Sequence, residues 1–272
     1  MRGACDCHVH VFGPPGRYPL SPERRYTPPQ ASVEELLALQ ERLGLERVVI
    51  VQPSPYGTDN GCMLDALRRL GRRARGVAVI DEHSSLVSMH EAGVRGVRVN
   101  LETGGERDPA VALRKLEQAA ARVAPLGWHV QTFASLQVLS TLKSSIEALP
   151  VPLVVDHFGL PSPGADYAAV VSLVRSGKAY VKLSAPHRFA VQPDYADAEP
   201  FVRALLAANP ERLLWGSDWP HPGTGPRERP RDIQPFDAVD DARALERLAG
   251  WVSSPAQLEK ILVTNPARLY DF

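Results

Sequence analysis

The chain has 272 residues, of which 44% are hydrophobic and 23% charged, so it can bury a sizeable core and disorder is not expected. Its 31 basic and 31 acidic residues give a formal net charge of zero, which argues against general binding to nucleic acid or to an anionic membrane. Three cysteines without framework spacing do not fit a disulfide-stapled secreted domain.

The sequence contains no apolar run that reads as a signal peptide, and no apolar stretch approaches the ~20 residues that a membrane helix needs. We therefore expect a cytoplasmic protein with free cysteines and no membrane or nucleic-acid partner. The sequence does not indicate the oligomeric state.

The first predicted element is a strand that contains His8 and His10. Alternate side chains of a strand face the same side, so these two imidazoles should point together, with Cys5 and Cys7 on the opposite face. Two strand histidines that merely alternate are the alternative interpretation, and the short pattern by itself favours a functional site only modestly.

A repeating unit of helix and strand follows a proline-rich and glycine-rich loop at residues 13–30. Ser32 and Glu35 form a capping box for the first helix, which should end at Gly44. Further strands are predicted at residues 47–52, 76–80, 94–100, 128–133, 153–157, 179–184 and 213–218. Further helices are predicted at residues 59–70, 85–92, 110–126, 136–149, 167–176, 200–208, 238–249 and 255–263. The segment 220–235 is expected to be the loop after the eighth strand.

Eight strands alternating with helices predict an α/β fold, a (β/α)₈ TIM barrel, for which ~250 residues are typical. We expect residues 1–272 to form this barrel as a single domain, because no segment could supply a second core.

Polar side chains end several of the predicted strands, and in a barrel these ends meet at one mouth. They are His8, His10, Ser54, Arg98, Asn100, His157, Arg188 and Asp218. Buried polar groups without partners cost ~1–3 kcal/mol each, so a water-filled working site is the economical interpretation.

The sequence resembles the amidohydrolase superfamily (amidohydrolase-related family 2), and within it the metal-independent lactonases that act on 2-pyrone-4,6-dicarboxylate. The resemblance covers nearly the whole chain. Its most specific stretches are Asp6-Cys7-His8-Val9-His10-Val11-Phe12-Gly13, Arg25-Tyr26-Thr27-Pro28, Val94-Arg95-Gly96-Val97-Arg98, Val155-Asp156-His157, Trp215-Gly216-Ser217-Asp218-Trp219-Pro220-His221-Pro222 and Asn265-Pro266-Ala267-Arg268-Leu269-Tyr270.

This resemblance implies that Asp218 is the general base that takes a proton from water. It also implies that His8, His10 and His157 bind the lactone carbonyl and its developing oxyanion. Because a free aspartate has a pKa of ~3.9 and is a weak base, we expect desolvation to raise the pKa of Asp218.

The same resemblance places Tyr26, Ser54, Arg98 and Arg188 around the substrate, a small carboxylated lactone. Guanidinium groups suit carboxylates through paired hydrogen bonds, and ion pairing within loops is the alternative for both arginines.

No metal is expected. A pair of histidines with a late aspartate also begins the site of metal-dependent relatives, so a single zinc on His8, His10 and Asp218 is the alternative. Those relatives add a histidine on strand five or a lysine or glutamate on strand four. This chain has Gln131 on strand five, and Arg98 on strand four would repel a divalent cation.

Four positions depart from the pyrone-dicarboxylate lactonases. Gly104 and Leu160 replace arginines, Phe133 replaces a tyrosine and Gly223 replaces an asparagine. With two cations and two hydrogen-bonding groups missing, we expect a lactone with fewer carboxylates or a different ring. Lactone isomerisation, a metal-dependent hydrolase or decarboxylase of the superfamily, and a catalytically silent binding protein remain as alternatives.

Overall fold

The structure, a computed structural model, describes residues 1–162, 164–223, 229–252 and 254–272. Eight parallel strands lie in the order of the sequence, each paired with the next. The strands are β1 (Cys5–Val9), β2 (Arg47–Val51), β3 (Ala74–Ala78), β4 (Val94–Asn100), β5 (His129–Phe133), β6 (Leu153–Val155), β7 (Ala179–Ser184) and β8 (Leu213–Gly216).

The first and last strands meet just beyond the end of β8. Val9 bridges to Trp219 in the parallel sense, and the His10 amide donates to the Trp219 carbonyl at 2.8 Å. The Asp218 amide donates to the His8 carbonyl at 2.9 Å. These contacts bring the segment that carries Asp218 beside the two N-terminal histidines.

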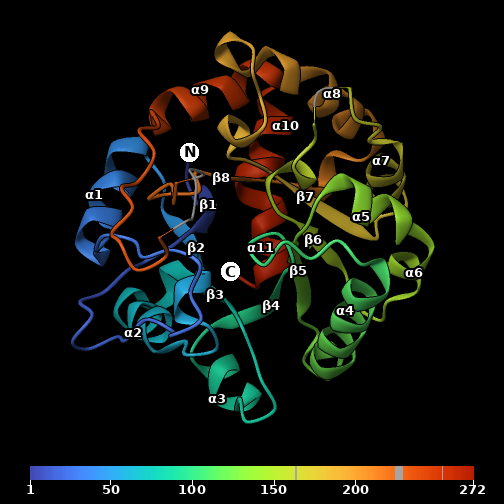
Figure 1. The fold of residues 1–272 in the computed structure, drawn as a ribbon. Helices are drawn as coiled ribbons and strands as arrows, with labels where there is room; N and C mark the ends of the chain where they lie inside the picture. The colour runs from blue at the N-terminus through green and yellow to red at the C-terminus, as the bar shows by residue number, and fades with distance from the viewer. Residues whose placement is uncertain (163, 224–228, 253) are drawn as a thin grey trace.

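Helices surround the strands as an outer ring (Figure 1). They are α1 (Val33–Leu43), α2 (Gly61–Leu70), α3 (Leu86–Glu91), α4 (Pro109–Val123), α5 (Leu136–Thr141), α6 (Lys143–Ala148), α7 (Ala168–Arg175), α8 (Glu199–Ala208), α9 (Asp241–Trp251), α10 (Pro255–Glu259) and α11 (Asn265–Tyr270). The predicted single-domain (β/α)₈ barrel is confirmed, and so are the capping box of Ser32 with Glu35 and the left-handed cap at Gly44. None of the helices in these described ranges is both long and apolar enough to cross a membrane.

The single helix predicted over residues 136–149 is wrong, because α5 ends at Thr141 and α6 begins at Lys143. The Thr141 hydroxyl donates to the Gln137 carbonyl at 3.0 Å, a local bond that competes with the regular helix. Residues 224–228 of the predicted loop at 220–235 lie outside the described residues.

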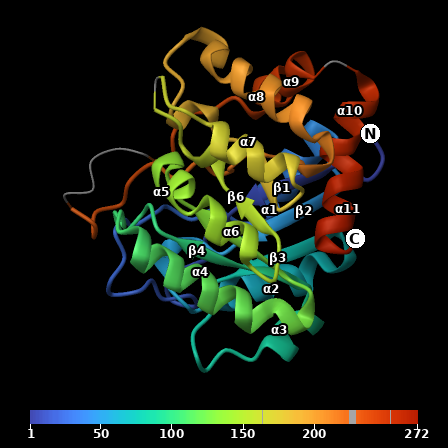
Figure 2. The same cartoon turned by 90° about the vertical axis from the view of Figure 1, so that its right-hand side faces the viewer.

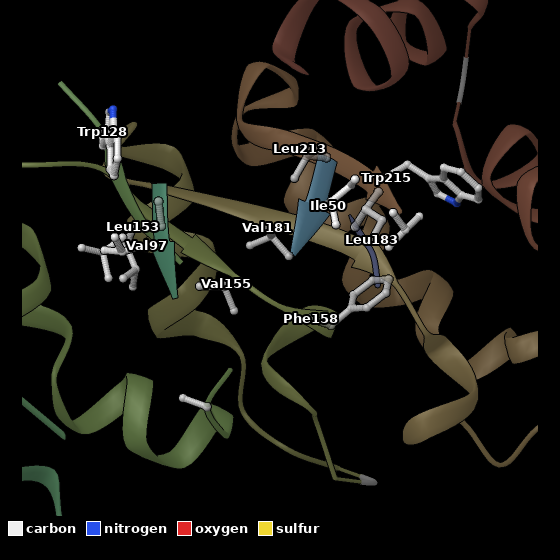
Figure 3. Packing of buried hydrophobic residues seen from close by; sticks show 14 of the residues in the cluster. Ile50, Val97, Trp128, Leu153, Val155, Phe158, Val181, Leu183, Leu213 and Trp215 are labelled. Atoms are coloured by element: carbon white, nitrogen blue, oxygen red, sulfur yellow. The ribbon is translucent and has the colours of Figure 1, made fainter. Parts of the chain in front are cut away.

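Two sets of buried side chains alternate along the strands. One set faces the helices, and Figure 3 shows part of it, from Trp128 before β5 to Trp215 on β8. The other set packs inside the barrel and includes Val49, Val51, Val154, Tyr180, Leu214, Cys5 and Cys7. The prediction that Cys5 and Cys7 face away from the histidines is therefore wrong, because both pack inside the barrel and the register of β1 shifts between Asp6 and Val9. This bulge lets neighbouring residues share the inner side.

The C-terminal helix α11 lies across the floor of the barrel, on the side where both chain termini are found (Figure 2). Arg75 on β3 donates through its Nε to the Tyr270 carbonyl at 3.0 Å. The Tyr270 ring is fully buried and meets His129 edge to face, with 5.2 Å between ring centroids.

Candidate active site

The residues that follow β6, β7 and β8 bend sharply into the mouth of the barrel. His157 lies on a short 3₁₀ turn (His157–Gly159) with φ 50°, and Asp218 has φ 69°. Non-glycine residues rarely adopt this left-handed conformation, and it is concentrated at functional sites. Neither residue ends a strand as predicted, because β6 stops at Val155 and β8 at Gly216.

Three imidazoles converge on one oxygen of Asp218. The Nε2 atoms of His8, His10 and His157 each lie 3.6 Å from Asp218 Oδ1. Within the described chain, Asp218 Oδ1 has no hydrogen-bond partner. The structure therefore brings together the four residues expected to carry the chemistry, around an oxygen that remains free to accept a proton.

Arg188 occupies the other oxygen of Asp218. It lies on a 3₁₀ turn (Pro186–Arg188), and its Nε and Nη2 donate to Asp218 Oδ2 at 3.0 and 2.6 Å. Burial alone would raise the pKa of Asp218, but Arg188 and the surrounding histidines outweigh it and hold that pKa well below its usual range. The expected upward shift is therefore wrong, because this guanidinium binds the aspartate itself.

Hydrogen-bond partners identify the proton-bearing nitrogen of His10. Its Nδ1 lies 2.8 Å from the Val51 carbonyl, which can only accept, so Nδ1 carries a proton. His157 Nδ1 instead meets the Ser184 hydroxyl at 2.8 Å, and a hydroxyl can donate or accept. Burial lowers the pKa of His157 to about 3, so this ring is neutral at physiological pH.

Beneath the histidines lies a buried layer of charged and amide groups. Arg98 on β4 donates through Nε to Asp156 Oδ2 at 3.2 Å, and Gln131 on β5 donates to the same oxygen at 3.1 Å. Lys182 on β7 donates to Gln131 Oε1 at 2.7 Å and lies 3.2 Å from His8 Nδ1. Burial alone would raise the pKa of Asp156, but His8, Lys182 and Arg98 hold it well below its usual range.

Sequence analysis missed Lys182 and the place of Asp156 in this layer. The signal for Lys182 is a lysine in the middle of the otherwise apolar strand Ala179–Ser184. Lysine is almost never fully buried without a partner, so its position already indicates an acceptor inside the barrel. Asp156 was visible only as the neighbour of His157.

The remaining residues predicted at strand ends or around the substrate do not all lie beside the cluster. Tyr26 is buried near Arg188: burial alone would lower the pKa of that guanidinium, but Asp218, with a smaller contribution from Tyr26, raises it. Ser54 is half-buried at the start of a 3₁₀ turn three residues beyond Val51. Asn100 instead bonds Thr103 within its own loop at 2.9 and 3.0 Å, so it is not part of the cluster.

The cluster is more enclosed than the water-accessible site expected from the sequence. The side chains of Asp218 and His157 are 1% and 2% exposed, and those of Arg98 and His10 are 5% exposed. Its polar groups are shielded from bulk solvent, which strengthens the electrostatic contacts among them.

A divalent metal fits this cluster poorly. Ligating atoms of His8, His10 and Asp218 lie within 4.8 Å of one another, as do those of His8, Asp156 and His157. A ligating histidine normally donates its second N–H to an acceptor, as His10 does to Val51. The aligned partner of His8 Nδ1 is instead a lysine amine, which donates.

Comparisons with known proteins cover nearly the whole chain. A family model described as amidohydrolase matches residues 5–272. The chain is 38% identical to the 2-pyrone-4,6-dicarboxylate hydrolase of Comamonas testosteroni, over 98% of this chain and 90% of the relative. It is 35% identical to the 4-sulfomuconolactone hydrolase of Rhizobium radiobacter, over 99% of this chain and 90% of the relative. A crystal structure from Pseudomonas putida, assigned provisionally as a 2-pyrone-4,6-dicarboxylic acid hydrolase, is 30% identical with a TM-score of 0.83, covering 100% and 98% of the two chains.

Proposed function

Because this chain belongs to the amidohydrolase family of enzymes, we propose that it is a lactonase, which opens the cyclic ester ring of a small anionic substrate with water. The observation that carries the proposal is Asp218 Oδ1, which has no hydrogen-bond partner among the described residues and lies 3.6 Å from three imidazole Nε2 atoms. The relatives named hydrolases of 2-pyrone-4,6-dicarboxylate and 4-sulfomuconolactone support a cyclic ester as the substrate.

In the proposed reaction Asp218 Oδ1 takes a proton from water as the water oxygen attacks the lactone carbonyl carbon. The π electrons of the carbonyl move to its oxygen, and the resulting oxyanion is stabilised by His8, His10 and His157. When the oxyanion collapses, the ring C–O bond breaks and the departing ring oxygen takes the proton back from Asp218. The product carries a new carboxyl group and a hydroxyl, or the keto form of an enol, and the enzyme returns to its starting state.

Electrostatic stabilisation has to supply most of the rate enhancement, because Asp218 is a weak base. Its pKa lies well below the usual range, so the carboxylate is ionised at neutral pH but accepts a proton reluctantly. Removing one preorganised oxyanion donor from an enzyme costs ~10²–10³ in kcat. A buried site whose donors face the carbonyl oxygen compensates for this weak base.

Arg98 is the proposed contact for an anionic group on the substrate. Only its Nε is used by Asp156, and its guanidinium lies 5.4 Å from the centroid of the Phe133 ring. Arg188 is a weaker choice, because Asp218 already binds it. Since Gly104, Leu160, Phe133 and Gly223 supply no further cations, the proposed substrate has fewer carboxylates than 2-pyrone-4,6-dicarboxylate, or a different ring.

A proton-release screen of the purified protein against sugar lactones, muconolactones and pyrones tests this proposal. We expect turnover of at least one singly charged lactone, unchanged after incubation with a chelator and dialysis. Efficient turnover of 2-pyrone-4,6-dicarboxylate would refute the substrate class. If the chelator abolishes activity and added zinc restores it, the metal-free reaction is refuted. If no lactone is turned over, the alternative of a catalytically silent binding protein is favoured.

A further inference from the structure

Lys182 is a fully buried ammonium that the proposed reaction does not use directly. It lies on β7 with its Nζ 2.7 Å from Gln131 Oε1, 3.2 Å from His8 Nδ1 and 3.6 Å from Asp156 Oδ1. An isolated buried charge is very costly, so the two acceptors and the nearby Asp156 carboxylate explain how the barrel tolerates a lysine here.

The direction of the hydrogen bonds follows from the neighbouring amide. Gln131 donates its Nε2 to Asp156 Oδ2 at 3.1 Å, which turns its oxygen toward Lys182. Lys182 therefore donates on that side, and an ammonium has no lone pair with which to accept from His8. His8 Nδ1 must then accept from Lys182, so the single proton of the neutral ring is on Nε2.

His8 and His10 consequently differ at Nδ1, although both present Nε2 to the same oxygen of Asp218. His10 donates through Nδ1 to the Val51 carbonyl, whereas His8 accepts there from Lys182. His8 exposes an N–H at Nε2, in a fully buried position 3.6 Å from Asp218 Oδ1. Sequence spacing treats the two residues as equivalent, and only their Nδ1 partners distinguish them.

We propose that Lys182 is a positioning residue that holds His8 as an Nε2–H donor, and that it thereby prevents His8 from acting as a ligand in a zinc site with His10 and Asp218. The donor role rests on the proposed lactonase function, because the N–H would serve the substrate carbonyl oxygen. The block on zinc is independent of the reaction.

The alternative state of His8 is also built into the structure. Asp156 Oδ1 lies 3.2 Å from His8 Nδ1, and no hydrogen bond reaches that oxygen from the described residues. Without the Lys182 amine, Nδ1 would carry the proton and donate to Asp156, the pairing typical of metal-ligating histidines. Nε2 of His8 would then carry the lone pair that a zinc ion needs, beside His10 and Asp218.

The net charge of the cluster also disfavours binding of a divalent cation while Lys182 is present. Three cations, Arg98, Lys182 and Arg188, face two carboxylates, Asp156 and Asp218, so these five side chains carry a net charge of +1. Removing Lys182 brings the group to zero. A divalent cation would then enter a site that no longer repels it through a net positive charge.

The experiment compares wild type with Lys182→Met, and uses Lys143→Met, at a surface lysine paired with Glu147, as the matched control. Long-range ¹H–¹⁵N NMR of ¹⁵N-histidine protein reports which His8 nitrogen is protonated, with the signal assigned through His8→Gln. Zinc affinity is measured by calorimetric titration of metal-stripped protein. For Lys182→Met we expect a His8 Nδ1–H and at least about tenfold tighter binding of one zinc ion, a change lost on adding Asp218→Asn.

Wild type and Lys143→Met should show a His8 Nε2–H and weak zinc binding. A wild-type His8 protonated on Nδ1, or a wild type that binds zinc as tightly as Lys182→Met, would overturn the proposal. If Lys182→Met does not fold, Lys182→Gln and the wild-type NMR measurement still decide it. Neither measurement uses a lactone. If every lactone fails in the screen but His8 carries its proton on Nε2, only the proposed function is refuted.

Discussion

The mouth and the floor of this barrel each hold a fully buried histidine whose pKa burial lowers to about 3. At the mouth, His157 meets the Ser184 hydroxyl and faces Asp218. At the floor, neither ring nitrogen of His129 has a hydrogen-bond partner within the described ranges, and its neighbour is the Tyr270 ring. A lowered histidine pKa therefore reflects burial at both ends of the barrel. What distinguishes the candidate site is the convergence of three imidazoles on Asp218 Oδ1.

The largest effect is expected for Asp218→Asn, which removes the proposed base at the mouth. We expect kcat for a lactone substrate to fall by about 10²–10⁴-fold, the usual contribution of general base catalysis. Proton release under saturating substrate measures the change. Asp65→Asn, at a carboxylate paired with the exposed Arg17, is the control and should stay within about twofold of wild type. An Asp218→Asn variant that retains a tenth of the wild-type kcat would contradict the assignment.

The pH dependence of the wild-type rate sharpens the same assignment. Because the folded pKa of Asp218 lies below its usual range, the carboxylate stays ionised throughout the neutral and mildly acidic region. We expect protonation of Asp218 to lower kcat/KM only below about pH 3.9, the reference pKa of aspartate. Stopped assays over short times, with circular dichroism to confirm folding, measure it. An acid limb near pH 6 that disappears in Asp218→Asn would be incompatible with the pairing to Arg188.

A matched pair of histidine variants tests the contrast between mouth and floor directly. His157→Gln should lower kcat by about 10²-fold, because one polar group near the reacting carbonyl is lost. His129→Gln should change kcat by less than about twofold, since no hydrogen bond joins its ring nitrogens to the cluster in the described part of the chain. Thermal unfolding of both variants separates activity from stability. If His157→Gln and His129→Gln lower kcat equally at comparable stability, the assignment of the active site to the mouth rather than the floor is contradicted.

Arg98→Lys tests the proposed anion contact while it preserves the positive charge beside Asp156. Loss of the planar guanidinium should raise KM for an anionic lactone by about tenfold and change kcat less. Arg95→Lys is the matched control, because Arg95 lies on the same strand and pairs with Asp271 at the floor. A KM that is unchanged in Arg98→Lys would assign the anion to another residue.

A smaller effect, on stability rather than rate, is expected at Asp6. Burial raises the pKa of Asp6 to about 7, although its Oδ1 accepts from the backbone amides of His8 and Ser217. The folded protein therefore holds this proton more tightly than the unfolded chain and loses stability as pH rises from about 4 to 7. Asp6→Asn should gain stability relative to wild type between pH 4 and 8, by up to about 4 kcal/mol.

Urea unfolding at the two pH values measures this difference, with Glu23→Gln at an exposed carboxylate as the control. If the difference in unfolding free energy between Asp6→Asn and wild type is the same at pH 4 and pH 8, Asp6 does not titrate differently in the folded and unfolded chain.

The sequence predicted the barrel well because its signals are local: the alternation of helix and strand and the cap at Gly44. It also brought together His8, His10, His157 and Asp218, since strand ends meet at one mouth. It failed where the outcome depends on contacts across the barrel. The pairing of Arg188 with Asp218, the bulge that turns Cys7 inward and the donor from Lys182 to His8 each join distant segments, which no spacing rule encodes.

The left-handed backbone around the mouth has a practical consequence for engineering. Leu160 follows the turn of His157 with φ 49°, is half-buried and lies outside the charged cluster. Glycine adopts this conformation without the ~1–2 kcal/mol penalty of a side chain, although it also loses more entropy on folding. Efforts to make a heat-tolerant variant should therefore leave His157 and Asp218 unaltered and begin with Leu160→Gly, where relief of the torsional penalty does not touch the reacting groups.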